Sequence, residues 1–136
     1  MQERVRWGDV DAARIIFYGA YLRFFEFAET EMFHHVGLTY SHVFDQLKIW
    51  LPRVHLDCDF YHAALLDDLL EVSTFVREFG NKSFRLNFEV RRNGEEEMIA
   101  SAHFVFATVD HNIFKSISVP EEMRQRLVPF TQVNAN

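Results

Sequence analysis

The chain has 136 residues, a length that suits one compact domain, and 49% of them are hydrophobic, so a core can form without disulfides or metals. Its formal net charge is −6 and its 14 Lys and Arg residues are scattered, whereas nucleic-acid-binding surfaces gather basic residues in a patch or stripe. Cys58 is the single cysteine, which excludes an intramolecular disulfide and a zinc site built on paired cysteines.

The N-terminal part predicts a strand, a loop and a long helix. Residues 2–7 alternate weakly between polar and apolar side chains, as in a short strand, and residues 8–14 lack a period, as in a loop. Residues 17–36 carry apolar side chains at spacings of three and four, which predicts a helix that ends near Gly37. Additional phenylalanines widen its apolar face, so we expect a largely buried helix with other elements wrapped around it.

Four strand patterns follow a less regular stretch that contains Pro52. The third alternates apolar and polar side chains, which predicts one buried and one wet face, and the dipeptide Asn93-Gly94 after it is a strong hairpin signal. The fourth is apolar on both faces and is expected to lie centrally in the sheet. The four strands are predicted over residues 54–61, 70–79, 84–91 and 99–109.

The C-terminal part predicts a short strand near residues 114–117 and a final helix from Pro120 to about Leu127. Proline suits the first turn of a helix, and the two glutamates behind it suit the positive end of the helix dipole. We expect a single domain over residues 1–129 and a loose C-terminal tail over residues 130–136.

Together these elements predict an α+β fold, because one strand and a long buried helix precede a run of antiparallel strands. The sheet must curl around the helix to bury both the helix and its own inner face. The periodicity therefore predicts an antiparallel β-sheet wrapped around one long central α-helix.

Residues 5–21, VRWGDVDAARIIFYGAY, resemble the signature of the 4-hydroxybenzoyl-CoA thioesterase family. That pattern joins a strand to Asp-x-Asp, two small residues, usually a glycine, two aliphatic residues, and Tyr-x-x-Tyr at the start of the long helix. Further similarities follow in the same order along residues 4–127. They are Asp57-Cys58-Asp59-Phe60, the paired aspartates in Leu66-Asp67-Asp68-Leu69, the turn Asn81-Lys82-Ser83-Phe84 and the junction Ser118-Val119-Pro120.

The resemblance implies a hot-dog fold and an acyl-CoA thioesterase that hydrolyses an aryl or short acyl thioester to the carboxylate and free CoA. It implies Asp11 as the catalytic carboxylate, either nucleophile or general base, since both mechanisms need the same group. It also implies that the backbone N–H of Tyr18 polarises the thioester carbonyl. The first N–H groups of a helix lack partners and lie at its positive end, so this role is physically reasonable.

Six residues are expected to contact substrate or CoA. Arg14 stands where the family usually has glycine, so it either carries the steric cost of a positive φ or approaches Asp11 or the ligand. The aromatic residues near the motif suit an aryl or short acyl group, although they also suit a core, and the turn before the third strand resembles the family's nucleotide-binding turn. The expected contacts are Arg14, Phe17, Tyr21, Phe60, Lys82 and Ser83.

Other readings of the acidic residues remain open. Asp11 could be a loop or N-capping aspartate, and Asp9 is expected to be structural and solvated. Glu26 shares a polar stripe with Arg23 and is expected to pair with it. Some hot-dog thioesterases place the catalytic acid on the long helix, where this chain has Glu26, Glu29 and Glu31.

We expect no metal and no cofactor beyond the CoA of the substrate, because no carboxylate-histidine spacing among the seven histidines completes a ligand set. The family implies a homodimer or homotetramer with sites between subunits. Alternatives are a non-catalytic acyl-CoA or acyl-ligand binding protein on the same fold, and an acyl-ACP thioesterase. The start lacks the apolar core of a signal peptide and no apolar run reaches ~18 residues, so we expect a cytoplasmic protein without a membrane partner.

Overall fold

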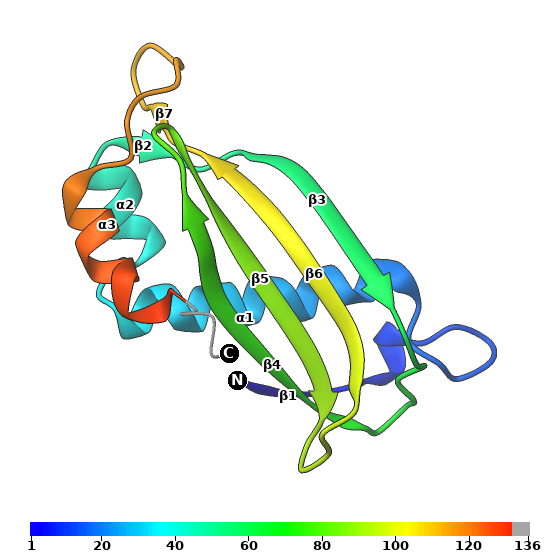
Figure 1. Ribbon diagram of the computed structural model, residues 1–136. Coiled ribbons are helices and arrows are strands. Elements are labelled where there is room, and N and C mark those ends of the chain that lie inside the picture. Colours follow the sequence, from blue (N-terminus) through cyan, green and yellow to red (C-terminus); the bar gives the residue numbers. More distant parts are fainter. Residues whose placement is uncertain (132–136) are drawn as a thin grey trace.

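The computed structural model describes residues 1–131 and shows one antiparallel sheet wrapped around a long helix (Figure 1). The five strands follow the order β1-β4-β5-β6-β3, so β1 and β3 form the two edges. The long helix α1 (Tyr21–His35) crosses one face of this sheet. The strands of the sheet are β1 (Gln2–Arg4), β3 (Arg53–Phe60), β4 (Leu69–Phe79), β5 (Ser83–Arg92) and β6 (Met98–Ala107).

Smaller elements lie at the ends of the large sheet and of α1. A second, two-stranded sheet pairs β2 with β7, and the helices α2 and α3 pack beside it (Figure 1). Short 3₁₀ helices precede α1 and follow α3. These elements are α2 (Tyr40–Asp45), β2 (Ile49–Trp50), β7 (Val109–Asp110), α3 (Glu121–Leu127), η1 (Trp7–Asp9), η2 (Tyr18–Ala20) and η3 (Val128–Phe130).

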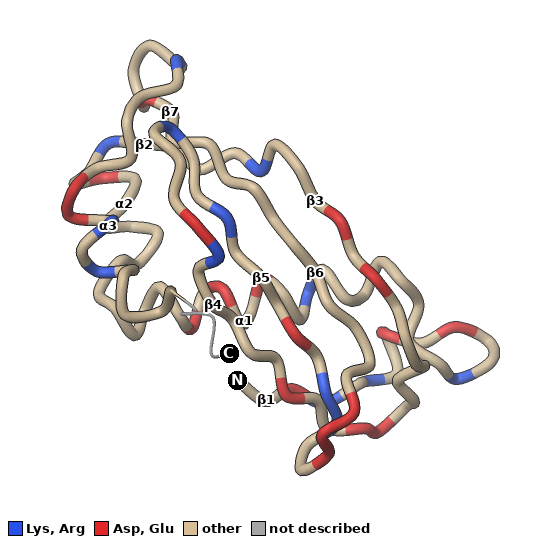
Figure 2. The backbone as a smooth tube through the Cα atoms, viewed as in Figure 1, with Lys and Arg blue, Asp and Glu red and all other residues tan. Residues whose placement is uncertain are grey.

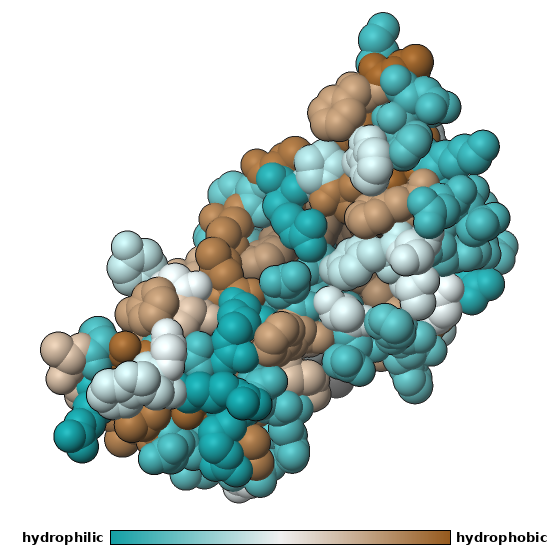
Figure 3. All heavy atoms as spheres, turned by 180° about the vertical axis from the view of Figure 1, so that it is seen from behind, coloured by the Kyte–Doolittle hydropathy of each residue, from teal (hydrophilic) through white to brown (hydrophobic). Residues whose placement is uncertain are grey.

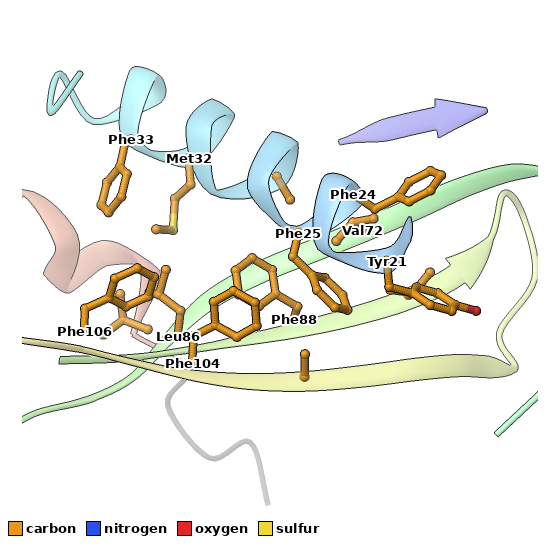
Figure 4. Close-up of a cluster of buried hydrophobic side chains, with 14 of the residues drawn as sticks. Tyr21, Phe24, Phe25, Met32, Phe33, Val72, Leu86, Phe88, Phe104 and Phe106 are labelled. Atoms are coloured by element: carbon orange, nitrogen blue, oxygen red, sulfur yellow. The ribbon is translucent and has the colours of Figure 1, made fainter. Parts of the chain in front are cut away.

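Aromatic side chains join α1 to the inner face of the sheet (Figure 4). Phe25 points from α1 toward two phenylalanines of the sheet, with ring centroids 5.1 Å from Phe88 and 5.7 Å from Phe104. Two turns further along α1, the ring centroid of Phe33 lies 6.5 Å from that of Phe84. Full burial of one such side chain contributes about 1.5–3 kcal/mol, so this contact fixes the helix against the sheet.

The structure confirms the hot-dog fold and most of the predicted elements. Gly37 ends α1 with a φ of +76°, a conformation that glycine adopts without steric cost. Along β5 buried and partly exposed residues alternate, as the sequence predicts, and β6 lies between β5 and β3. The final helix begins directly after Pro120.

Two expectations need correction. The less regular stretch between the long helix and the first predicted strand contains two unpredicted elements, β2 and α2. The first turn of α2 is capped by the Thr39 side chain, which accepts from the His42 N–H at 3.2 Å. Residues 114–117 form no strand, because Phe114 adopts a φ of +56° and is 70% exposed. In place of a strand, Ser116 forms an isolated antiparallel bridge with Val109.

The C-terminal boundary stays a prediction. The residues Val128–Phe130 form η3, and Thr131 makes an isolated parallel bridge to Val76. Residues 132–136, most of the predicted tail, lie outside the described residues. Within residues 1–131, no helix is both long and apolar enough to cross a membrane.

Candidate active site

Asp11 lies on a tight loop that leads into the long helix. An isolated bridge between Val10 and Ile16 closes this loop, and the Asp11 N–H donates to the Ile15 carbonyl at 3.0 Å. The Asp11 carboxylate is exposed, and its Oδ1 accepts from the backbone N–H of Ala13 at 2.8 Å. Within the part of the chain that the structure describes, its Oδ2 makes no hydrogen bond, so one carboxylate oxygen is held in place and the other faces solvent.

Arg14 adopts the positive φ that its position suggested, with a value of 63°. Two backbone hydrogen bonds hold this geometry: the Arg14 N–H donates to the Asp11 carbonyl at 2.9 Å, and the Leu66 N–H donates to the Arg14 carbonyl at 3.1 Å. Among residues 1–131 its guanidinium makes no ion pair, so it does not contact the Asp11 carboxylate. The departure from glycine therefore costs conformational energy, and no side-chain ion pair or hydrogen bond of Arg14 within the described residues offsets it.

Asp9 is structural but buried, so the expectation that it is solvated is wrong. It is 5% exposed and binds Arg23 of α1 through two hydrogen bonds, one of them between Nε and Oδ1 at 3.0 Å. Its Oδ2 also accepts from the Arg6 N–H at 2.8 Å. Arg23 therefore pairs with Asp9, and the predicted pair with Glu26 is absent among residues 1–131.

Tyr18 begins the helical segment that η2 and α1 form together. Its side chain is 80% exposed. Its backbone N–H makes no hydrogen bond within residues 1–131, as is usual in the first turn of a helix. A free N–H at this end of the helix can donate to an oxygen that develops negative charge.

An aromatic pocket of about 320 Å³ opens beside this helix start. The rings of Tyr21 and Phe60 form its wall, with centroids 5.2 Å apart. Burial raises the pKa of Tyr21 to about 12, with a further increase from Cys58 and Asp68, so its hydroxyl stays neutral. The pocket is lined by Ile15, Ile16, Tyr18, Tyr21, Phe60, Tyr61, His62 and Ala63.

The predicted contact residues thus fall into two groups. Tyr21 and Phe60 line the pocket, whereas Phe17 is 40% exposed just outside its lining. Lys82 and Ser83 lie at the opposite end of the sheet: Ser83 pairs with Ala107 of β6, and Phe60 pairs with Ala100. Seven residues of strand separate these two pairs, or about 23 Å. One chain therefore does not bring Lys82 and Ser83 to Asp11.

The helix carboxylates divide by burial. Glu29 is 1% exposed and accepts two hydrogen bonds from Arg53 Nη2, at 2.6 and 2.7 Å, while Glu26 and Glu31 are exposed. Burial raises the pKa of the Glu29 carboxyl, and the Arg53 guanidinium opposes that rise. Because Arg53 belongs to β3, this pair joins α1 to the edge strand. The Arg53 guanidinium also lies 4.8 Å from the ring centroid of Phe106.

Sequence reasoning missed several residues of this region. Tyr61, His62 and Ala63 line the pocket but lie just beyond β3, where no sequence pattern marked them. The Glu29–Arg53 pair had a visible signal: Glu29 lies next to Ala28 and four residues after Phe25, so a carboxylate falls beside the apolar face of the helix.

A sheet wrapped around a single long helix is the hot-dog architecture, which solved thioesterase structures share. The model of the Thioesterase-like superfamily matches residues 5–127, and the chain therefore belongs to this family of enzymes.

Similar proteins extend over nearly the whole chain. The acyl-CoA thioesterase YbgC of Haemophilus influenzae is 32% identical over 121 residues, which cover 89% of this chain and 88% of that protein. The 4-hydroxybenzoyl-CoA thioesterase of Pseudomonas sp. strain CBS-3 is 30% identical over 129 residues, or 90% of this chain and 92% of that protein. The solved structure of a gentisyl-coenzyme A thioesterase has a TM-score of 0.81 and 30% identity, covering 93% of this chain and 98% of that one.

Proposed function

We propose that this protein hydrolyses aryl- or short acyl-CoA thioesters to the carboxylate and free CoA, with Asp11 as nucleophile or general base. The observation that carries the proposal is the junction of loop and helix. There the exposed Asp11 carboxylate lies seven positions before Tyr18, whose backbone N–H makes no hydrogen bond within residues 1–131 and whose side chain lines the aromatic pocket.

The chemistry of a thioester matches what this junction offers. Sulfur donates poorly into the carbonyl and a thiolate leaves readily, so hydrolysis needs an oxyanion site and a carboxylate rather than a strong general acid. The Tyr18 N–H would polarise the carbonyl oxygen. The free Oδ2 of Asp11 would attack the carbonyl carbon or take a proton from water, while the Ala13 N–H holds Oδ1.

The shape of the pocket favours an aromatic acyl group. Its volume of about 320 Å³ is near the lower end for ligand sites, and Tyr21 and Phe60 offer ring faces and edges to an aryl substrate. Two similar proteins are named for hydroxylated aromatic substrates, 4-hydroxybenzoyl-CoA and gentisyl-coenzyme A. We therefore propose an aryl-CoA as the preferred substrate class.

The active enzyme is proposed to be a homodimer, or a homotetramer built from it, that pairs two β3 strands. β3 is an open edge of the sheet and exposes Val54 (62%), Leu56 (45%) and Phe60 (51%). Seen from behind, apolar side chains gather on the side of the molecule where β3 runs (Figure 3). An exposed apolar edge strand is a template for pairing with a second chain.

A two-fold axis at the middle of β3 would explain how distant residues join one site. Antiparallel pairing sets the Arg53 end of one β3 beside the Phe60 end of the other. The Lys82–Ser83 turn of one protomer would then lie at the same end of the sheet as Asp11 of its partner. In this arrangement Lys82 can neutralise CoA phosphates while Asp11 acts on the thioester.

Thiol release from a panel of benzoyl-, hydroxybenzoyl-, short-chain and long-chain acyl-CoAs tests the proposal. We expect kcat/KM to be highest for the aryl-CoAs and to fall at least tenfold for long chains, which exceed the pocket. Matched acyl-ACP substrates should be slower, because the carrier protein is acidic and so is this chain. Binding of acyl-CoA without thiol release from any substrate would instead support a non-catalytic binding protein. We also propose a cytoplasmic location, where acyl-CoAs are formed.

A further inference from the structure

A second constellation of polar side chains lies on the outer face of the sheet, away from α1 and the aromatic pocket. His55 and Asp57 are two residues apart on β3 and share a face, and His103 of β6 pairs directly with Asp57. Their potential ligand atoms all lie within 4.8 Å of one another. The strand register brings these residues together across 46 positions of sequence, which is why no local spacing revealed them.

We propose that His55, Asp57 and His103 form a binding site for a divalent transition-metal ion such as Zn²⁺. Imidazole nitrogens with one carboxylate oxygen are a ligand set that zinc accepts. The site is independent of the thioesterase proposal, and it replaces the expectation from the sequence that the chain has no metal ligand set.

The separations of the ligand atoms fit a tetrahedral ion. Asp57 Oδ2 lies 3.0 Å from His55 Nε2 and 3.2 Å from His103 Nδ1. Two ligands at about 2.0–2.1 Å from a tetrahedral zinc ion lie about 3.3 Å apart. The two histidine nitrogens lie within 4.8 Å of each other, so side-chain rotations that bring them to about 3.3 Å would place an ion between the three atoms.

The charges around the cluster are mixed. Acidic residues lie along β3 (Figure 2), and Asp59 adds a second carboxylate on the face that carries Asp57. Arg85 opposes binding, because its Nη1 lies 3.5 Å from His103 Nε2 and a metal on Nδ1 leaves a proton on Nε2. Arg85 is already paired with Glu78 at 3.1 Å, so it can turn away from the imidazole.

A bound ion would join the edge strand β3 to β6 through side chains. This link would add to the backbone ladder between the two strands and so resist their local separation. Ligands that bind the folded state raise its apparent stability, so zinc should raise the thermal midpoint of the whole protein.

Calorimetric titration of Zn²⁺ into the untagged protein at pH 7.5 tests this site, with metal-free His55→Ala and His103→Ala variants beside wild type. We expect one ion per chain and a Kd that rises roughly tenfold or more in each variant, since each loses a direct ligand. His34→Ala removes an exposed histidine of α1 and should bind as wild type does. Circular dichroism should show that each variant is folded, and His55 is exposed enough that its loss should not disturb packing.

Two further readouts make the result specific. The thermal midpoint of wild type should rise with added zinc and that of His55→Ala should not. Arg85→Gln should bind zinc more tightly than wild type, because the substitution removes a nearby positive charge and supplies an oxygen that can accept from His103 Nε2. Absence of zinc binding by wild type, or equal affinity in wild type, His55→Ala and His103→Ala, would overturn the proposal.

Discussion

At the scale of single residues, the loop from Asp9 to Arg14 shows what sequence can and cannot predict. The motif selected two aspartates, but their different environments depend on tertiary contacts. Asp9 binds Arg23, fourteen positions away, whereas the hydrogen bonds of Asp11 within residues 1–131 stay inside its own loop. The positive φ of Arg14 could be anticipated, because the family usually has glycine there. The absence of an ion pair between Arg14 and Asp11 could not be anticipated, because the local sequence does not determine the rotamer of a long side chain.

Arg14→Gly is predicted to stabilise the protein by about 1 kcal/mol. A non-glycine residue in the left-handed region costs roughly 1–2 kcal/mol, and the greater flexibility of glycine in the unfolded chain cancels part of that gain. Urea unfolding of the two proteins measures the difference. Arg14→Ala keeps the Cβ and should show no such gain, and a loss of stability in Arg14→Gly would mean that the arginine side chain makes a stabilising contact.

At the scale of elements, alternation and helical spacing predicted α1 and the strands of the large sheet, because each buries one regular face. The failures lie where a tertiary contact, not a period, defines the element. The helix α2 has six residues, too few for a clear period, and residues 114–117 resemble a strand but form an isolated bridge to β7 in place of a strand. Strand register likewise required the structure, as the pairing of Asp57 with His103 illustrates.

The Glu29–Arg53 pair is predicted to be a main attachment between α1 and the edge strand β3. Glu29→Ala removes a buried carboxylate and leaves the Arg53 guanidinium without its partner, which should lower the free energy of unfolding by roughly 2–3 kcal/mol. This loss of free energy is smaller than the loss expected for a fully buried ion pair, because the Arg53 side chain is 42% exposed.

The exposed Glu26 on the same helix provides the control for this measurement. Glu26→Ala should change the free energy of unfolding by less than about 0.5 kcal/mol, as surface substitutions usually do. Equal effects of the two substitutions in urea unfolding would mean that the Glu29–Arg53 pair adds nothing to the attachment.

At the scale of the whole molecule, the sequence pointed to Lys82 and Ser83 as CoA contacts but could not reveal that they lie at the far end of the sheet from the aromatic pocket. The proposed dimer resolves this separation, because it would set the turn of one protomer near the pocket of the other. We therefore expect the proposed dimer to be needed for activity.

Val54→Lys is predicted to produce a monomer with at least tenfold lower kcat/KM. A lysine on an open strand edge discourages pairing with a second chain. Light scattering reports the mass and thiol release reports the activity. Val128→Lys changes a similarly exposed valine (55%) outside β3 and should leave both unchanged. A Val54→Lys protein that stays dimeric would show that the subunits join elsewhere.

The proposed catalytic role of Asp11 is tested by comparing wild type with Asp11→Asn on the best aryl-CoA substrate. Asparagine keeps the size of the side chain and the oxygen that accepts from Ala13, but it can neither attack a carbonyl nor take a proton. We predict that kcat falls on the order of a thousandfold while the Kd for a non-hydrolysable acyl-CoA analogue stays within about threefold of wild type. Undiminished thiol release by Asp11→Asn would contradict the account and direct attention to the helix carboxylates Glu26, Glu29 and Glu31.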